Sequence, residues 1–208
     1  MIVKNYNIDG KYPYVVIDDW YTPEEEENVW KELDFITQPN LMSKPTDPKS
    51  HAALDSNKKP LAKHLKLFTS DLYTPEGRKY SHISLLAGKQ KTEKFEDEIV
   101  KNGLPDHHQS FVNCSKVNCL ISYYENSDYY KSHADSFNYT TFIWLYKKPK
   151  SFTGGNLVLT NSNDTIECVN NRLLLIPSFY QHSVTEVNQS AQSKVGYGRY
   201  CISTFWNF

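Results

Sequence analysis

The pattern of hydrophobic and polar positions changes near Pro105. After this residue, apolar side chains alternate with polar or smaller ones, as at Cys119, Ile121 and Tyr123. A period of two is typical of strands with one buried face. The pattern predicts eight short strands, near 116–124, 129–135, 139–147, 156–160, 165–169, 172–176, 180–187 and 198–207.

The N-terminal half is predicted to contain a strand, helices and a long loop. Residues 14–17 (YVVI) look like a short strand. The run Thr22-Pro23-Glu24-Glu25 predicts a helix start, because it offers a capping threonine, a proline for the first helical position and a glutamate that completes a capping box. Helical spacing of apolar residues predicts further helices at 61–72 and near 92–102. The polar segment 37–60 separates them from the first helix.

Eight short strands punctuated by turn residues predict a two-sheet jelly roll or barrel. With the N-terminal helices, the expected class is mainly β, of the α+β kind. A chain of 208 residues fits one domain. We expect N-terminal helical support and loops over 1–112 and a jelly-roll core over 113–208.

Composition narrows the functional classes. The formal net charge of −1 gives no indication of nucleic-acid binding or of an anionic membrane partner. No apolar run is as long as a membrane span, and the N-terminus lacks the layout of a signal peptide. A soluble, cytoplasmic protein is therefore expected, with no prediction of its oligomeric state. The cysteines form no Cys-x-x-Cys pair, which disfavours zinc knuckles and redox motifs.

Four residues in the C-terminal half suggest a particular chemistry. His133 and Asp135 lie two apart in a predicted strand, and His182 lies in a later one. Residues two apart on a strand point the same way, so both can bind one ion. Two imidazoles and one carboxylate can hold octahedral Fe(II) and leave three positions open. Arg199, on the last predicted strand, can hold a carboxylate by a two-pronged hydrogen bond.

The order of motifs over 123–206 resembles that of the Fe(II)/2-oxoglutarate-dependent dioxygenases, close to their prolyl 4-hydroxylase branch. This ordered series is much more specific than any single motif. It consists of Tyr123 and Tyr130 ahead of His133-Ala134-Asp135, then FIWLY, Gly154-Gly155-Asn156-Leu157, RLLLIP at 172–177, His182-Ser183-Val184, Arg199-Tyr200 and Phe205-Trp206.

The resemblance implies a double-stranded β-helix, a cupin-like jelly roll with iron in its mouth. His133, Asp135 and His182 would be the metal ligands and the catalytic centre. Arg199 would bind the distal carboxylate of 2-oxoglutarate. Fe(II), 2-oxoglutarate and O2 are the implied cofactors, with ascorbate as a candidate reductant. The implied activity is hydroxylation, with prolyl residues of a peptide or protein as the favoured substrate.

Several further positions follow from the resemblance. The tyrosine that contacts 2-oxoglutarate in the family falls near Trp144, whose indole N–H can donate one hydrogen bond. Tyr123 can face the pocket or lie in the core, and Tyr130 can support the site or simply pack. Ser203 shares a strand face with Arg199. The spacing from His182 to Arg199 is long for prolyl hydroxylases and indicates an inserted loop, so Lys194 is a rival anchor for 2-oxoglutarate. No substrate-binding residue is predicted.

Other functions remain open at this stage. Within the same enzyme class, the substrate can be a free amino acid or another small metabolite. From another class, the chain can be a non-catalytic jelly-roll binding module, although such relatives usually lose a ligand or the anchor. A zinc hydrolase also uses His, His and carboxylate ligands, but that function leaves Arg199 unexplained.

Overall fold

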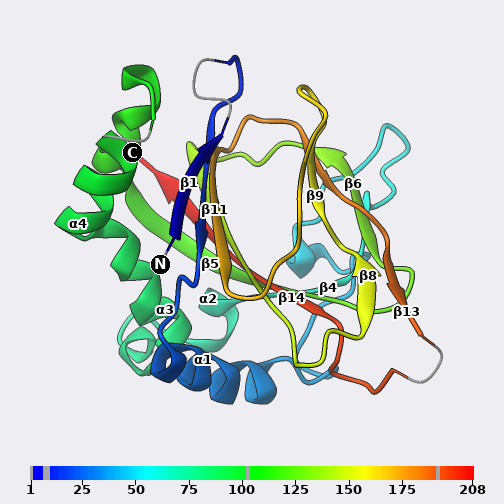
Figure 1. Cartoon of the computed structure of the whole chain (residues 1–208). Helices are drawn as coiled ribbons and strands as arrows, with labels where there is room; N and C mark the ends of the chain where they lie inside the picture. Colours follow the sequence, from blue (N-terminus) through cyan, green and yellow to red (C-terminus); the bar gives the residue numbers. More distant parts are fainter. Residues whose placement is uncertain (1, 7–9, 102–103, 191–192) are drawn as a thin grey trace.

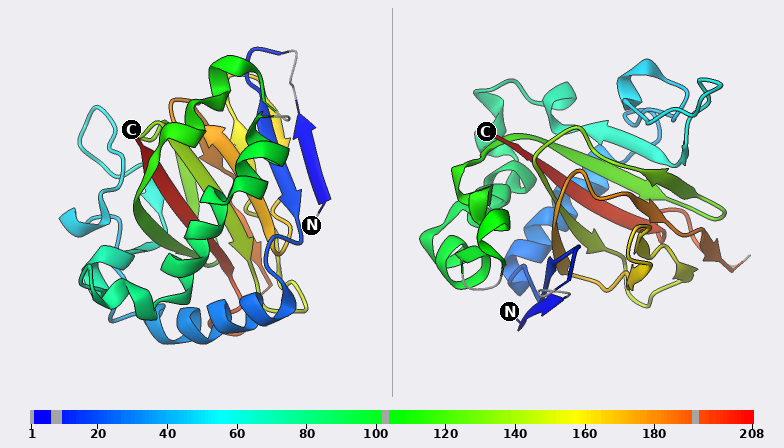
Figure 2. Two further views of the ribbon diagram at one scale, coloured as in Figure 1. Left: turned by 90° about the vertical axis from the view of Figure 1, so that its left-hand side faces the viewer. Right: turned by 90° about the horizontal axis from the view of Figure 1, so that it is seen from above.

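The computed structural model describes residues 2–6, 10–101, 104–190 and 193–208. Its described part is mainly β, with antiparallel sheets that face each other (Figures 1 and 2). The larger sheet contains, in spatial order, β1 (Ile2–Tyr6), β2 (Tyr14–Asp18), β11 (Arg172–Pro177), β7 (Tyr139–Leu145), β14 (Arg199–Asn207), β5 (Ser115–Tyr124) and β4 (Leu65–Phe68).

A smaller sheet faces the larger one across the interior of the molecule. It contains, in spatial order, β10 (Asp164–Ile166), β9 (Leu157–Leu159), β12 (His182–Val184), β6 (Tyr129–His133) and β3 (Ala62–Lys63). The short strands β8 (Phe152–Gly154) and β13 (Val187–Gln189) pair separately. His64 alone separates β3 from β4, so the chain crosses here from the smaller sheet to the larger one.

The helices cover the outer face of the larger sheet (Figure 2). Helix α1 (Pro23–Ile36) begins with the predicted capping box: the Thr22 side chain accepts from the Glu25 N–H, and the Glu25 side chain accepts from the Thr22 N–H. No helix of the described residues is long and apolar enough to cross a membrane. The other helices are α2 (Thr69–Leu72), α3 (His82–Ala87) and α4 (Glu93–Phe95), with a π-helical turn at Glu96–Lys101 and 3₁₀ turns at Pro48–Ser50, Gly77–Tyr80, Gly88–Lys91 and Asp106–Asn113.

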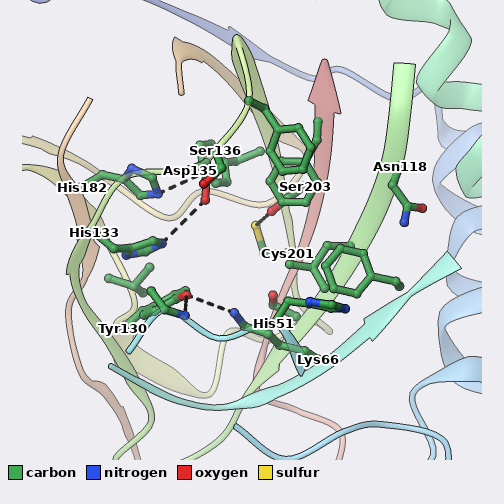
Figure 3. A pocket seen from close by; sticks show the side chains of 18 of the residues that line it. His51, Lys66, Asn118, Tyr130, His133, Asp135, Ser136, His182, Cys201 and Ser203 are labelled. Atoms are coloured by element: carbon green, nitrogen blue, oxygen red, sulfur yellow. Dashed lines mark hydrogen bonds and ion pairs between the residues drawn. The ribbon is translucent and has the colours of Figure 1, made fainter. Parts of the chain in front are cut away.

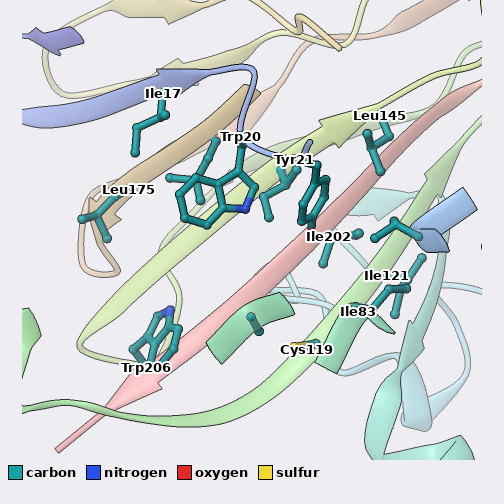
Figure 4. Close-up of a cluster of buried hydrophobic side chains, with 14 of the residues drawn as sticks. Ile17, Trp20, Tyr21, Ile83, Cys119, Ile121, Leu145, Leu175, Ile202 and Trp206 are labelled. Atoms are coloured by element: carbon teal, nitrogen blue, oxygen red, sulfur yellow. The ribbon is translucent and has the colours of Figure 1, made fainter. Parts of the chain in front are cut away.

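The main hydrophobic core lies between these helices and the larger sheet (Figure 4). Leu33 of α1 and Ile83 of α3 are fully buried against sheet residues such as Ile121 and Ile202. Alternate residues of the same strands point to the opposite face, into a second cluster between the sheets. The helix-covered core therefore holds the larger sheet in place while its inner face remains available for a site.

The strand predicted at 14–17 is confirmed as β2, and residues 1–112 also contain β1, β3 and β4, which the sequence did not predict. The predicted helix at 61–72 is wrong: this segment forms β3, β4 and only the short α2. Leu65 and Leu67 pack toward the helix-covered core, while Lys66 faces the other way. The segment thus has a period of two, and pairing of β4 with β5 stabilises it as a strand.

The predicted C-terminal strands all correspond to observed strands, with some changes of boundary. The predicted strand at 180–187 is divided into β12 and the start of β13, and β8 was not predicted. The predicted strand at 129–135 ends at His133, so Asp135 lies outside it. This last difference matters for the site.

Candidate active site

A cavity of about 490 Å³ lies between the two sheets. Side chains of β4, β5 and β14 line it from one side, and side chains of β6 and β12 from the other (Figure 3). Its volume falls within the range of about 300–1,000 Å³ that is usual for small-molecule sites. His133, Asp135, His182, Arg199 and Ser203 all contribute to its lining.

His133 and His182 face each other across paired strands. They are register partners of β6 and β12. The Nδ1 atom of each ring lies 2.9 Å from a backbone carbonyl oxygen, that of Lys131 for His133 and that of Tyr180 for His182. A carbonyl only accepts hydrogen bonds, so Nδ1 carries the proton and Nε2 presents its lone pair to the cavity. Burial, and then the neighbouring His182, lower the pKa of His133 to about 3, so this ring is neutral near pH 7.

Asp135 completes the cluster from the irregular segment that follows β6. Its carboxylate oxygens lie 3.8 Å from Nε2 of His133 and 3.8 Å from Nε2 of His182. Two contacts outside strand geometry hold it: its N–H donates to the Ser178 carbonyl at 3.0 Å, and the Thr140 hydroxyl donates to its carboxylate at 2.9 Å. The predicted strand alternation is therefore not what positions Asp135.

These three side chains can hold a metal ion. Their ligand atoms all lie within 4.8 Å of one another. Neutral imidazole nitrogens with a single carboxylate are a donor set typical of Fe(II) centres that leave coordination positions open for other ligands. The carbonyl partners of both histidines fix the orientation of the rings before any metal binds.

Arg199 is a buried cation at the inner end of the cavity. It is 1% exposed, and its Nε donates to the Gly155 carbonyl at 2.7 Å. Its guanidinium carbon lies 4.5 Å from the ring centroid of Tyr124, while Nη1 has no hydrogen-bond partner among the described residues. A buried, incompletely paired guanidinium is suited to bind a carboxylate from a ligand.

The rival anchor lies elsewhere. Lys194 is an exposed residue of the loop before β14 and does not line the cavity. Ala191 and Gln192 of the same predicted insertion lie outside the described residues. The geometry therefore favours Arg199 over Lys194 as the partner of a ligand carboxylate.

Of the two positions open to Tyr123, the structure shows the core and not the cavity. Tyr123 packs against Tyr200 in the helix-covered core, and its hydroxyl donates to Glu125 at 2.9 Å. The physical reason is strand alternation, since Cys119 and Ile121 face that same core. The neighbouring Tyr124 lines the cavity instead, beneath the Arg199 guanidinium.

Of the two other candidate residues, Ser203 lines the cavity and Trp144 lies behind its wall. Ser203 lines the cavity on the same strand face as Arg199. Trp144 is fully buried in the inner cluster and does not reach the cavity surface. Its ring centroid lies 5.9 Å from the Arg199 guanidinium carbon, and its Nε1–H has no partner in the described structure. Two buried donors without partners thus lie close together.

Three further residues line the cavity: Tyr130, which belongs to the ordered motif series, and Lys66 and His51, which the sequence did not predict there. Tyr130 stacks on His133 with ring centroids 3.6 Å apart, and its hydroxyl accepts from the Ala53 N–H at 3.0 Å. Lys66 donates to the same hydroxyl at 3.2 Å. His51, an exposed residue, also lines the cavity. Period-two spacing around Lys66 was the available signal for its inward direction.

Comparisons with known proteins give one family match and several structures with a similar fold. Residues 119–207 match the family model of the 2OG-Fe(II) oxygenase superfamily. The matched region is less than half of the chain, and it contains His133, Asp135, His182 and Arg199. The superfamily implies Fe(II), 2-oxoglutarate and O2, and the donor set and the incompletely paired Arg199 fit these groups. No curated protein matches the chain in sequence.

Solved prolyl hydroxylases share the fold. One, from Trichoplax adhaerens in complex with a hypoxia inducible factor oxygen degradation domain peptide, is 15% identical with a TM-score of 0.55, covering 93% of this chain and 83% of that one. The viral collagen prolyl hydroxylase of Paramecium Bursaria Chlorella virus-1, in its 2OG complex, is 12% identical with a TM-score of 0.57, covering 97% and 99%. A Pseudomonas putida prolyl-4-hydroxylase is 11% identical with a TM-score of 0.57, covering 95% and 93%.

Proposed function

We propose that this protein is an Fe(II)- and 2-oxoglutarate-dependent dioxygenase that hydroxylates prolyl residues of a peptide or protein. One observation carries the proposal: three correctly oriented metal-ligand side chains share a cavity with a buried guanidinium that lacks a complete set of partners. We further propose that the chain acts as a single dioxygenase domain, and that its facing sheets form a double-stranded β-helix.

Each side chain has a distinct role in this proposal. Nε2 of His133, Nε2 of His182 and the carboxylate of Asp135 hold Fe(II). Arg199 binds the distal carboxylate of 2-oxoglutarate, and the Trp144 N–H is a second donor near that end of the cavity. The bound iron and 2-oxoglutarate supply the oxidising chemistry, while the side chains orient them and exclude water.

The prolyl substrate is supported by the comparisons and by the openness of the cavity. All three solved relatives described above are prolyl hydroxylases, and one is bound to a peptide. The outer end of the cavity is lined by the exposed residues Ser70 and Asp71 and by His51. A peptide can therefore approach the metal ligands from this side.

The test is anaerobic binding followed by turnover. With Fe(II) and 2-oxoglutarate, the protein should show the weak visible metal-to-ligand charge-transfer band of a keto-acid chelate. In air, with a reductant, it should form succinate slowly even without primary substrate. His182→Ala should lose the band, because two ligands do not retain the iron in this geometry. A well-folded, iron-loaded wild-type protein without the band would contradict the proposal.

A further inference from the structure

Lys66 is a second buried cation of the cavity, and the metal and 2-oxoglutarate sites do not account for it. It lies on β4 opposite Ser122, which also lines the cavity. Its backbone is hydrogen-bonded on its other side to Ser43, at 2.8 and 3.0 Å. The side chain therefore starts from a fixed position and points inward, toward Tyr130 (Figure 3).

The ammonium group of Lys66 is poorly compensated. The residue is 3% exposed, and lysine is almost never fully buried without a charged partner. It forms no ion pair in the described structure. Nζ donates to the Tyr130 hydroxyl at 3.2 Å and lies 4.4 Å from the centroid of that ring. An ammonium has three donors, so others remain available toward the cavity.

The charge on Lys66 persists at neutral pH. Burial lowers its pKa to about 8, and the Asp135 carboxylate acts in the opposite direction. The amine therefore remains mostly protonated near pH 7. Burying such a charge is costly unless an anion compensates for it. A position that retains a buried cation beside a ligand cavity indicates an anionic group in the ligand.

The location of Lys66 separates it from the 2-oxoglutarate anchor. In the strand register, Lys66 of β4 lies opposite Ser122 of β5, whereas Arg199 of β14 lies opposite Tyr124 of β5. The two backbones are thus offset by about 7 Å along the strands and about 10 Å across them. From Lys66, β4 runs outward through Phe68 to the exposed residues Ser70 and Asp71. Lys66 therefore lies nearer to the entrance than Arg199, on the side where a primary substrate enters.

We propose that Lys66 binds a carboxylate of the primary substrate. This inference rests on the proposed oxygenase function and specifies its substrate class. The carboxylate can belong to a free amino acid or to an acidic side chain next to the hydroxylated residue in a peptide. In either case, a charge-assisted hydrogen bond to Lys66 fixes one end of the substrate beside the metal ligands.

Matched probes that differ only in this carboxylate provide the test. The first pair is L-proline and L-prolinamide. The second is a prolyl peptide with glutamate beside the proline and the same peptide with glutamine. Binding is measured anaerobically by calorimetry on the Fe(II)-loaded protein, with and without N-oxalylglycine, a mimic of 2-oxoglutarate. The variants are Lys66→Met, which removes the charge, and Lys66→Arg, which keeps it. Lys59→Met, at an exposed loop lysine, is the control.

In the wild type, the acidic member of one pair should bind at least about tenfold more tightly than its neutral partner. The pair that shows this preference identifies the source of the carboxylate. Lys66→Met should remove the preference, Lys66→Arg should retain part of it, and Lys59→Met should retain all of it. Circular dichroism checks that each variant is folded.

Three outcomes overturn the proposal. The wild type binds both members of each pair equally well, or the preference for the acidic member survives in Lys66→Met. In the third outcome, Lys66→Met weakens the binding of N-oxalylglycine more than it weakens the binding of the acidic probe. The last outcome would assign Lys66 to the co-substrate instead. Succinate formation in air tests the oxygenase function separately. If the wild type forms no succinate but still prefers the acidic probe, the proposed oxygenase function fails while the carboxylate site at Lys66 stands.

Discussion

At the scale of single residues, the site depends on hydrogen bonds that fix side chains before any ligand arrives. The backbone carbonyls behind His133 and His182 set which nitrogen faces the cavity. Gly155 does the same for Arg199 by accepting from Nε. The remaining guanidinium N–H groups are therefore held ready for a carboxylate.

Arg199 should determine the affinity for 2-oxoglutarate. Removing one partner of a buried charge pair costs about 2–5 kcal/mol, so Arg199→Met should raise the Kd of 2-oxoglutarate by at least about 30-fold. Calorimetry on the Fe(II)-loaded protein measures this change. Lys194→Met is the matched control, and it should leave the Kd unchanged because Lys194 is exposed and remote from the cavity lining. A larger effect at Lys194 would show that the loop anchors the co-substrate.

At the scale of elements, the turn between β8 and β9 positions Arg199. Gly155 has a φ of +68°, a conformation that L side chains rarely adopt. A Cβ atom there would lie 2.7 Å from Cδ of Arg199 and 3.2 Å from Cγ2 of Val187. Such a contact forces the arginine stem to move, so this position of the turn requires glycine.

Gly155→Ala should therefore affect both stability and ligand binding. We expect the free energy of unfolding to fall by about 1–3 kcal/mol because of the backbone conformation. We also expect weaker 2-oxoglutarate binding because Arg199 is displaced. Urea unfolding and calorimetry measure the two effects. Gly88→Ala is the control, since a Cβ there meets nothing within 4 Å. Unchanged 2-oxoglutarate affinity in a folded Gly155→Ala protein would contradict this role of the turn.

The strands also show which features of the fold could be predicted from the sequence alone. Strand alternation correctly predicted that Ser203 shares a face with Arg199, because both lie on one long strand. The same rule, applied with Cys119 and Ile121, should have excluded Tyr123 from the cavity. The helix prediction for 61–72 was wrong because the apolar residues of this segment also fit a helical spacing. Its strand structure depends on pairing with β5, a contact distant in sequence.

Asp135 shows a second limit of prediction from sequence patterns. Its type and spacing predicted a ligand beside His133, and the structure does bring the two together. What holds it, however, is a pair of contacts to Ser178 and Thr140. Such contacts depend on how separate strands meet, which no local pattern reveals. Lys66 was missed for the same reason, since its burial follows from the way β4 joins the larger sheet.

At the scale of the whole molecule, the buried His133 links stability to pH. Its folded-state pKa of about 3 lies below the ordinary value of 6.5. Between these values the unfolded chain binds a proton that the folded protein does not, so stability rises with pH in this window. The metal-free protein should therefore lose unfolding free energy as the pH falls from 7 to 4.

Denaturant unfolding at a series of pH values measures this loss. His133→Gln should make the dependence less steep, because one titrating group is gone, while burial keeps the pKa of the remaining His64 well below its ordinary value. His82→Gln, at an exposed histidine, should leave it unchanged. Equal slopes for the wild type and His133→Gln would show that His133 does not titrate in this window.

The crossing from β3 through His64 to β4 has a consequence for how such a protein can diversify. The superfamily match begins at residue 119, yet Lys66, Phe68 and His51 of the cavity wall lie before it. Part of the cavity wall is thus encoded outside the stretch that contains His133, Asp135, His182 and Arg199. Substitutions in the earlier stretch can therefore reshape this part of the cavity while the candidate metal ligands and Arg199 remain unchanged.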